Sequence, residues 1–353
     1  MVTLREKFYG CIAASHIGSA MGAPVEGWSY DAITEKFGKL DRFTAYEHYG
    51  CGWVREPGTT EDGIERQKLI ITAIMEKNDR VNTEDVRKIW VRDIKPGAAG
   101  TISENFEGVL LAIAKSGIPA RDIGKYCDYS GLVTIARSCH PLALINAGDP
   151  DGAITDIYEC GQFYHIPNGR GIVWACVTAV AIAEACKPGA TVDSVLGAVF
   201  DKCDPVSVLP ELDRELKRTA GITEVEALRK IWDPVYCTFG IPYKQSHANE
   251  IISKSMCVFK CVNGSAKDAI LWAVNLGRDT DCAAAVAGGV AGALTGGASL
   301  PEEWARQLDY ATSLNVATNT QRTIREHSDG LYNAFVSRMK KGLMYADMMT
   351  ESA

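Results

Sequence analysis

Apolar residues recur along most of the chain at intervals of three and four, and few stretches alternate between apolar and polar residues. This spacing places the apolar side chains on one face of a helix. Turns rich in Gly, Pro and Asp separate the segments. The pattern predicts an all-α fold, with many helices in one domain that covers residues 1–353. The clearest predicted helices span residues 64–77, 103–117, 172–186, 191–203 and 266–277.

One segment, CAAAVAGGVAGALTGG at 282–297, is uncharged and consists mostly of small residues. Gly288, Gly292 and Gly296 recur at every fourth position, a spacing that also occurs in membrane helices. A helix of this length spans only about 24 Å, whereas a hydrocarbon core is about 30 Å thick. Small residues instead let neighbouring backbones approach closely. The segment therefore predicts a central buried Gly/Ala-rich helix that begins at residues 279–281.

The charges limit the classes of partner that the chain can bind. There are 37 basic and 44 acidic side chains, which give a formal net charge of −7, and the one basic cluster is RMKK at 338–341. A nucleic-acid-binding surface needs many clustered Lys and Arg side chains. We therefore expect neither nucleic acid nor a membrane as a partner. The pattern does not predict an oligomeric state.

The 12 cysteines lie in apolar contexts, and none forms a Cys-x-x-Cys pair. This distribution is typical of reduced, buried thiols rather than of a disulfide framework or a zinc site. The N-terminal stretch REKFYGCIAASHIGSAMGA at 5–23 has charges followed by an apolar run, as a signal peptide does, but Glu6 and His16 weaken that alternative. We predict a cytoplasmic protein.

Two acidic clusters are the strongest candidates for chemistry. Asp279 and Asp281 stand at the start of the predicted central helix, and Glu61 and Asp62 occur in GTTEDGIERQKL at 58–69. Each pair alone has a structural explanation, because carboxylates cap helix N-termini and offset the helix dipole. Together they combine carboxylate and hydroxyl oxygens without histidine. That is the ligand set of a hard divalent cation such as Mg²⁺ or Mn²⁺.

Four motifs resemble, in order, those of the ADP-ribosylglycohydrolase family, whose members include the dinitrogenase reductase-activating glycohydrolase. They are GSAMGAPVE (18–26), GTTED (58–62), NLGRDTDCAAAVAGGVAGALTG (275–296) and LPEEW (300–304). The third motif, followed by the Pro and Trp of the fourth, is the most specific, whereas the middle third of the chain is only loosely similar. The resemblance implies an all-α fold that holds two divalent cations, Mg²⁺ or Mn²⁺.

The resemblance also implies the site residues. The cations would lie between Thr60, Glu61 and Asp62 of the Thr-Asp-Asp motif and Asp279 and Asp281 of the Asp-Thr-Asp motif. They would orient the ribose hydroxyls of an ADP-ribosyl group, while a carboxylate activates the attacking water. The resemblance thus implies a small-molecule or ADP-ribosylated substrate.

A glutamate after the first glycine motif lies near the scissile bond in some members of the family, and Glu26 stands at that position. We predict Glu26 as the acid–base catalyst, with Glu61 as the second candidate. Such assistance contributes about 10²- to 10⁴-fold in rate.

The sequence departs from the family pattern at several positions. The family usually has Asp at the positions of Ser19 and Glu61, and a hydroxyl residue at the position of Cys282. A thiol is a poor ligand for a hard cation, so we expect one of the two ions to bind weakly or to be absent. In the arginine-specific branch an Asp lies near the position of Ala98 or Ala99. ADP-ribosyl-arginine is therefore the least expected substrate.

The sequence favours a metal-dependent glycoside hydrolase that cleaves an N- or O-glycosidic bond to ADP-ribose or a related ribosyl group. One alternative is a hydrolase of small nucleoside-like or other glycosidic substrates, which the changes at Ser19, Ala98 and Cys282 would suit. The other is a non-catalytic, crystallin-like relative. Glu26, Asp62 and the Asp279–Asp281 pair argue against the second alternative.

Overall fold

Helices form almost the whole of this computed structural model, which describes residues 2–47, 52, 54–95, 105–127, 130–236, 245–315 and 318–351. The elements of the first half are α1 (Leu4–Gly22), the 3₁₀ helix η1 (Ala23–Val25), α2 (Tyr30–Phe37), the strands β1 (Tyr46–Glu47) and β2 (Val54–Arg55), α3 (Asp62–Lys77), α4 (Thr83–Asp93), α5 (Asn105–Lys115), the 3₁₀ helix η2 (Ala120–Tyr126), α6 (Thr134–Ser138), α7 (His140–Leu144) and α8 (Pro150–Gly161).

The elements of the second half, among the residues described there, are all helices. They are α9 (Arg170–Ala185), α10 (Val192–Lys202), α11 (Leu209–Arg218), α12 (Val225–Tyr236), α13 (Ala248–Cys261), α14 (Ala266–Val274), α15 (Thr280–Thr295), α16 (Glu302–Leu314) and α17 (Ile324–Glu351). The predicted all-α class is confirmed. In the described part of the chain, no helix combines the length and apolarity needed to cross a bilayer.

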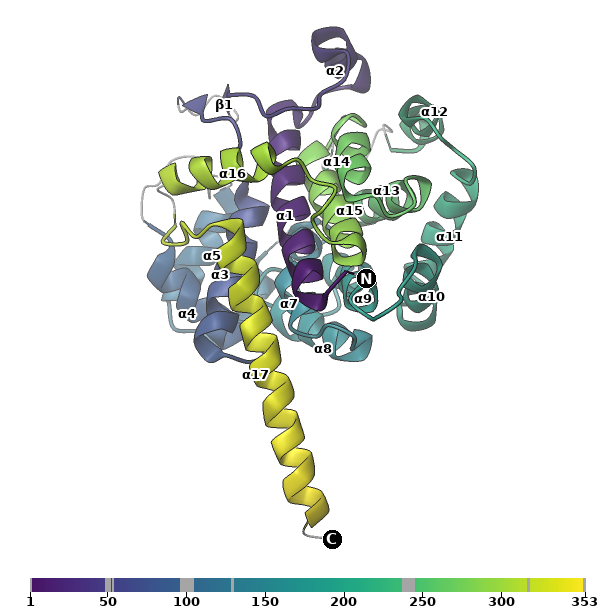
Figure 1. Cartoon of the computed structure of the whole chain (residues 1–353). Helices are drawn as coiled ribbons and strands as arrows, with labels where there is room; N and C mark the ends of the chain where they lie inside the picture. The colour runs from purple at the N-terminus through teal and green to yellow at the C-terminus, as the bar shows by residue number, and fades with distance from the viewer. Residues whose placement is uncertain are drawn as a thin grey trace.

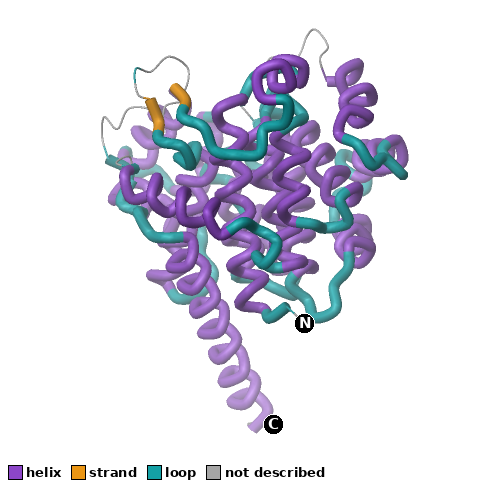
Figure 2. The backbone as a smooth tube through the Cα atoms, turned by 45° about the horizontal axis from the view of Figure 1, so that its top comes forward, coloured by secondary structure: helices purple, strands orange, loops and turns teal. Residues whose placement is uncertain are grey.

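Helices α1 and α15 lie side by side at the centre of the molecule, with the other helices around them (Figure 1). Helix accounts for nearly all of the regular structure in the described backbone (Figure 2). Helix α15 is buried from Thr280 to Ala293, which confirms the predicted central Gly/Ala-rich helix. Besides α1, it packs against α9, α13 and α14. Because the whole of this surrounding shell holds α15, its N-terminal turn is a rigid place for a site.

Missing side chains allow α1 and α15 to approach so closely. A Cβ added to Gly292 would lie 2.1 Å from the carbonyl oxygen of Gly10, and one added to Gly22 would lie 2.6 Å from the Cα of Asp281. Neither contact is possible between a real Cβ and a backbone atom. The Gly22 contact brings the C-terminal end of α1 directly against the first turn of α15.

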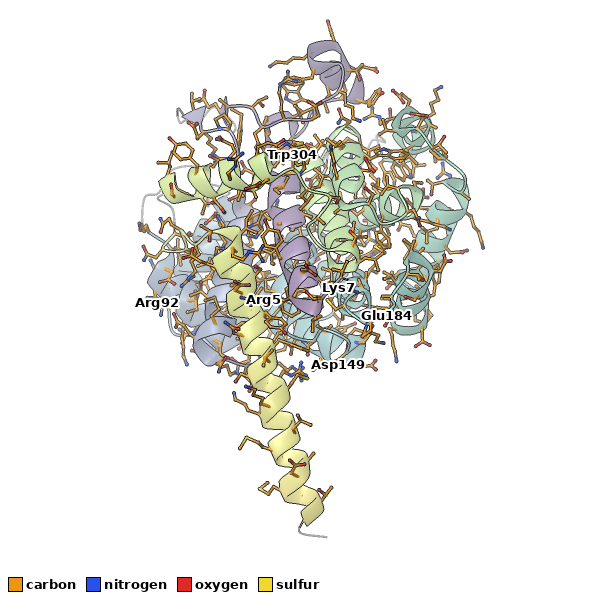
Figure 3. The ribbon with its side chains drawn as sticks, viewed as in Figure 1. Arg5, Lys7, Arg92, Asp149, Glu184 and Trp304 are labelled. Atoms are coloured by element: carbon orange, nitrogen blue, oxygen red, sulfur yellow. The ribbon has the colours of Figure 1, made fainter. Side chains whose placement is uncertain are left out.

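Helix α17 runs along the body and then extends beyond it, so its C-terminal part stands clear of other elements (Figures 1 and 3). Its last turns expose the apolar side chains of Leu343, Met344, Tyr345, Met348 and Met349. These side chains are not part of the core. A substitution at the exposed Gly342 in this region therefore tests helix propensity without a change in core packing.

A Gly292→Ala substitution is expected to lower the free energy of unfolding by about 1–3 kcal/mol, because the new methyl group forces α1 and α15 apart. Gly342→Ala on the exposed part of α17 is the matched control, since nothing lies within 4 Å of its Cβ position. That control should be neutral or stabilise the helix by up to about 1 kcal/mol. Urea unfolding followed by circular dichroism measures both. Equal stabilities for the two variants would contradict the close packing.

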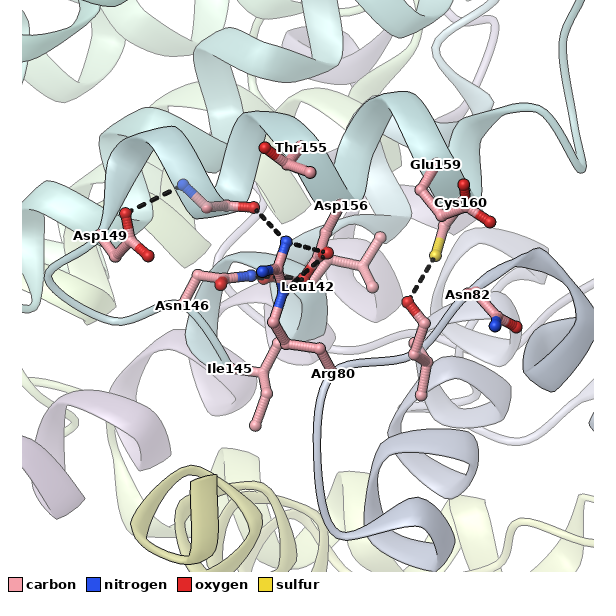
Figure 4. Close-up of polar contacts among 12 residues, drawn as sticks. Arg80, Asn82, Leu142, Ile145, Asn146, Asp149, Thr155, Asp156, Glu159 and Cys160 are labelled. Atoms are coloured by element: carbon pink, nitrogen blue, oxygen red, sulfur yellow. Dashed lines mark hydrogen bonds and ion pairs between the residues drawn. The ribbon is translucent and has the colours of Figure 1, made fainter. Parts of the chain in front are cut away.

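The acidic stretch before and within α8 serves the fold (Figure 4). Asp149 caps α8, with its Oδ1 accepting a hydrogen bond from the Gly152 amide at 2.9 Å. Arg80, in the connection between α3 and α4, pairs with Asp156 through Nη2 and Oδ1 at 2.6 Å. Asn146 donates to Oδ2 of the same carboxylate at 2.6 Å. This partly buried network joins α8 to the α3–α4 connection.

Candidate active site

The loop before α15 is fixed from two sides. Gly277 and Arg278 both have left-handed backbone conformations, with φ of 73° and 65°, and turn the chain into the helix. The Arg278 guanidinium binds the carboxylate of Glu250 through Nε at 2.6 Å and Nη2 at 2.9 Å. The backbone of Arg278 exchanges hydrogen bonds with residues beside Glu26: its amide donates to the Trp28 carbonyl at 2.8 Å, and its carbonyl accepts from the Gly27 amide at 2.7 Å.

Asp279 and Asp281 are both buried at the start of α15, and each has an unsatisfied oxygen. Asp279 Oδ1 accepts a hydrogen bond from the Cys282 amide at 3.3 Å, so the alternative explanation, a helix cap, applies to this oxygen. Neither Asp279 Oδ2 nor Asp281 Oδ1 has a hydrogen-bond partner among the described residues. One potential ligand atom from each of Asp279, Asp281 and Cys282 lies within 4.8 Å of the others. A buried carboxylate without donors is costly in its charged form, and burial and the charges of Glu26 and Asp279 raise the pKa of Asp281 well above its ordinary value. A bound cation would stabilise the charged form.

Glu61 lies at the N-cap position of α3 but makes no capping hydrogen bond. Its carboxylate is instead ion-paired with the Arg55 guanidinium and accepts a hydrogen bond from the Tyr46 hydroxyl. Tyr46 and Arg55 are opposite each other in the β1–β2 pair, so this short hairpin presents both donors to Glu61. The side chain of Glu61 is therefore committed to protein partners.

Thr60 is also engaged within the protein. Its Oγ1 donates to Glu65 Oε1 at 3.1 Å and accepts from Lys68 Nζ at 3.1 Å. Glu65 and Lys68 form a buried ion pair at 2.7 Å, to which Thr318 Oγ1 adds a hydrogen bond at 2.7 Å. The network connects the start of α3 to the segment before α17.

Asp62 and Asp281 are brought together by an arginine that the sequence did not single out. Nη2 of Arg137 lies 2.5 Å from Asp62 Oδ2, and Nη1 lies 3.2 Å from Asp281 Oδ2. Arg66 binds the same Asp62 oxygen at 2.6 Å. Arg137 belongs to α6, in the stretch TIARSCHP at 134–141, which carries no recognisable motif. Only the folded arrangement identifies it as part of the site.

Glu26 directly follows η1 and is half-buried. Its Oε1 accepts a hydrogen bond from Gln245 Nε2 at 3.1 Å. Burial and the nearby negative charges of Asp279 and Glu61 raise the pKa of Glu26 well above its ordinary value. The structure thus places the predicted catalytic carboxylate within the electrostatic reach of both acidic motifs, as required of a common site.

Besides Glu61, the departures from the family pattern are at Ser19, at Cys282 and at Ala98 or Ala99. Ser19 is buried within α1. Cys282 Sγ is 2.9 Å from Arg137 Nη1 and 3.7 Å from Asp281 Oδ2, so its altered side chain faces the arginine. Ala98 and Ala99 lie outside the described residues. The ten cysteines in the described part of the chain form no disulfide with one another.

The residues as placed fit one divalent cation better than two. The unsatisfied oxygens of Asp279 and Asp281 offer hard ligands on one side of the site. On the other side, Asp62 Oδ2 is bound by two guanidinium groups and Glu61 by Arg55 and Tyr46. The ion between the two motifs that the resemblance implies would have to displace these donors.

Fold and site together define a helical protein with a buried acidic centre at the start of its central helix. Residues 1–339 match the family described as ADP-ribosylglycohydrolase, and the chain belongs to that family. The family is one of hydrolases. An uncharacterized protein of Archaeoglobus fulgidus is 25% identical over 317 residues, which cover 86% of this chain and 92% of that protein.

A solved structure, titled as an ADP-ribosylglycohydrolase-related protein complex, has a similar fold. It superposes with a TM-score of 0.62 at 16% identity, and the alignment covers 95% of this chain and 98% of that chain. At this identity the similarity concerns the fold alone.

Replacing Glu26 with Gln is expected to stabilise the metal-free protein at neutral pH. Because the pKa of Glu26 is raised in the folded state, the unfolded chain loses this proton first as pH rises. The free energy of unfolding therefore falls between the ordinary pKa and the raised one. Glu26→Gln removes this loss and keeps Oε1 for the Gln245 hydrogen bond.

Thermal unfolding in EDTA from about pH 4 to pH 8 measures the effect. The variant should match the wild type at the acid end and exceed it increasingly as pH rises. A constant difference over the whole range would show that the charge of Glu26 is not the cause.

Proposed function

We propose that this protein is a glycoside hydrolase that cleaves an N- or O-glycosidic bond to ADP-ribose or a related ribosyl group. One observation carries the proposal: two buried aspartates at the start of α15 have unsatisfied oxygens beside a glutamate whose pKa is raised. Helix caps and structural ion pairs do not require such an arrangement. Family membership gives the class of substrate.

Asp279 and Asp281 are the proposed ligands of a divalent cation, Mg²⁺ or Mn²⁺. When bound, such an ion supplies positive charge that orients ribose hydroxyls and substrate oxygens. The protein contributes fixed ligand positions, because α15 is buried and the preceding loop is held by Glu250 and the backbone beside Glu26. The GTTED motif contributes no ligand in this arrangement. Its carboxylates, Glu61 and Asp62, form ion pairs with neighbouring arginines instead.

Glu26 is the proposed acid–base catalyst. Its raised pKa favours the protonated carboxyl, which can donate a proton to the leaving atom of the aglycone. The resulting carboxylate then accepts a proton from the water that attacks the anomeric carbon. Nearby carboxylates favour the oxocarbenium-like transition state that forms as the bond breaks. Glu61 is the weaker candidate because Arg55 and Tyr46 already bind its oxygen.

The proposed substrates rank from ADP-ribosyl compounds to simple nucleosides. The purified chain would be incubated with ADP-ribosylated serine and arginine peptides, O-acetyl-ADP-ribose and a set of nucleosides, each with Mg²⁺, Mn²⁺ or EDTA. Mass spectrometry would follow release of the free sugar. We expect EDTA-sensitive release from an ADP-ribosyl substrate, with arginine-linked ADP-ribose the slowest.

EDTA-sensitive turnover of nucleosides alone would support the alternative hydrolase. Absence of turnover on every substrate, in a chain that still binds the ion, would overturn the proposal in favour of a non-catalytic relative.

A further inference from the structure

We propose that the guanidinium of Arg137 is a built-in cation that takes the place of one of the two divalent ions implied between the acidic motifs. The group lies between them, with Nη2 2.5 Å from Asp62 Oδ2 and Nη1 3.2 Å from Asp281 Oδ2. Its side chain is only 10% exposed. The inference rests on the proposed function in one respect, the ion that Asp279 and Asp281 are proposed to bind. The position of Arg137 between the motifs does not depend on it.

Neighbouring residues make room for this side chain. A Cβ on Gly63 would lie 2.6 Å from Arg137 Nε and 2.7 Å from its Cδ, so only glycine directly after Asp62 lets the arginine pass. Cys282 Sγ lies 2.9 Å from Nη1, where the family usually has a hydroxyl ligand. The unusual Cys282 is thereby explained: with a guanidinium beside it, the position no longer serves a hard cation.

The backbone of Arg137 is held by the helix that carries Asp62. Gln67, buried on α3, donates from Nε2 to the Arg137 carbonyl at 2.8 Å and to Ser15 Oγ at 2.9 Å. The Arg137 amide donates to the Val133 carbonyl at 3.0 Å. The Arg137 carbonyl and guanidinium are therefore both held by α3, through Gln67 and Asp62, while the amide bond belongs to α6 itself. These contacts preorganise the guanidinium between its carboxylates.

A fixed charge at this place changes how many ions the site accepts. Arg137 neutralises charge on Asp62 and Asp281 that a second dication would need, and its guanidinium lies between Asp62 Oδ2 and Asp281 Oδ2, where that second ion would have to bind. Arg66 adds a second guanidinium on Asp62. Asp279, with the remaining oxygen of Asp281, is left to bind a single ion. The result is a centre with one exchangeable metal and one permanent cation.

The test compares Mn²⁺ binding by the wild type with that of Arg137→Met/Cys282→Thr, which removes the guanidinium and restores the hydroxyl. Equilibrium dialysis gives the number of ions per chain, and electron paramagnetic resonance distinguishes an isolated Mn²⁺ from an exchange-coupled pair. We expect an isolated ion in the wild type and one additional, coupled ion in the variant. Arg137→Lys keeps a positive charge and should retain the wild-type number.

Removing Arg137 leaves buried carboxylates unpaired, so circular dichroism with and without Mn²⁺ first establishes that the variant folds. Arg137→Gln is a second variant with the same expectation. A coupled pair in the wild type would overturn the inference without reference to any variant, as would equal ion numbers in the wild type and both variants. No ion in the wild type but one in the variant would support it and contradict the proposed ligand role of Asp279.

Discussion

Glu26→Gln is expected to lower kcat for the best glycosidic substrate by about 10²- to 10⁴-fold, because the amide can neither donate nor accept the transferred proton. Mn²⁺ affinity should be nearly unchanged, since Glu26 is not among the proposed ligands. The fold should also persist, because Gln keeps the Oε1 that accepts from Gln245. Steady-state kinetics and calorimetric metal titration measure the two properties on the same preparation.

The matched control is Glu226→Gln, which alters an exposed carboxylate that accepts a hydrogen bond from the Tyr30 hydroxyl. Its kcat should equal that of the wild type. Glu61→Gln is informative for another reason, because it weakens the contact with Arg55 while the Glu26 carboxyl stays in place. Near-normal turnover in Glu26→Gln together with a collapse in Glu61→Gln would transfer the acid–base role to Glu61.

Hydrophobic periodicity predicted the helices well because the positions that each helix buries are mostly apolar. The predicted helix at 191–203 corresponds to α10 (Val192–Lys202), and the one at 172–186 corresponds to α9 (Arg170–Ala185). The ends differ by one or two residues where local hydrogen bonds set the boundary. For example, the N-cap residue Thr191 and Ser194, in the first turn of α10, form a capping box that sets the start of the helix. Periodicity alone does not locate such a boundary.

The acidic half of the site was predictable from the sequence, whereas its basic half was not. Asp279 and Asp281 stand out because they precede a long apolar helix. Arg137 is 75 residues from Asp62 and 144 residues from Asp281, and it meets them only after α6 packs against α3 and α15. A buried arginine has no spacing that distinguishes it from an exposed one. The sequence therefore led us to expect two cations, because it did not reveal that the Arg137 guanidinium lies between the two acidic motifs.

Asp279→Asn is expected to weaken Mn²⁺ binding by more than about 100-fold, since loss of a mere supporting hydrogen bond around a metal already costs about 10- to 100-fold. The amide keeps one oxygen for the Cys282 N–H but replaces the unsatisfied Oδ2 with a group that cannot bind a cation. Asn caps helices as well as Asp does. Metal-free stability should therefore change little, while metal binding and turnover fall together.

Asp149→Asn provides the matched control, because Asp149 also caps a helix, with its Oδ1 accepting from the Gly152 amide at 2.9 Å. Both variants should unfold like the wild type in EDTA, and only Asp279→Asn should lose the rise in melting temperature that Mn²⁺ produces in the wild type. An equal rise in all three proteins would mean that Asp279 is only a helix cap. In that event the unsatisfied Oδ2 would need an explanation other than a cation, and the metal-dependent mechanism would lose its principal ligand.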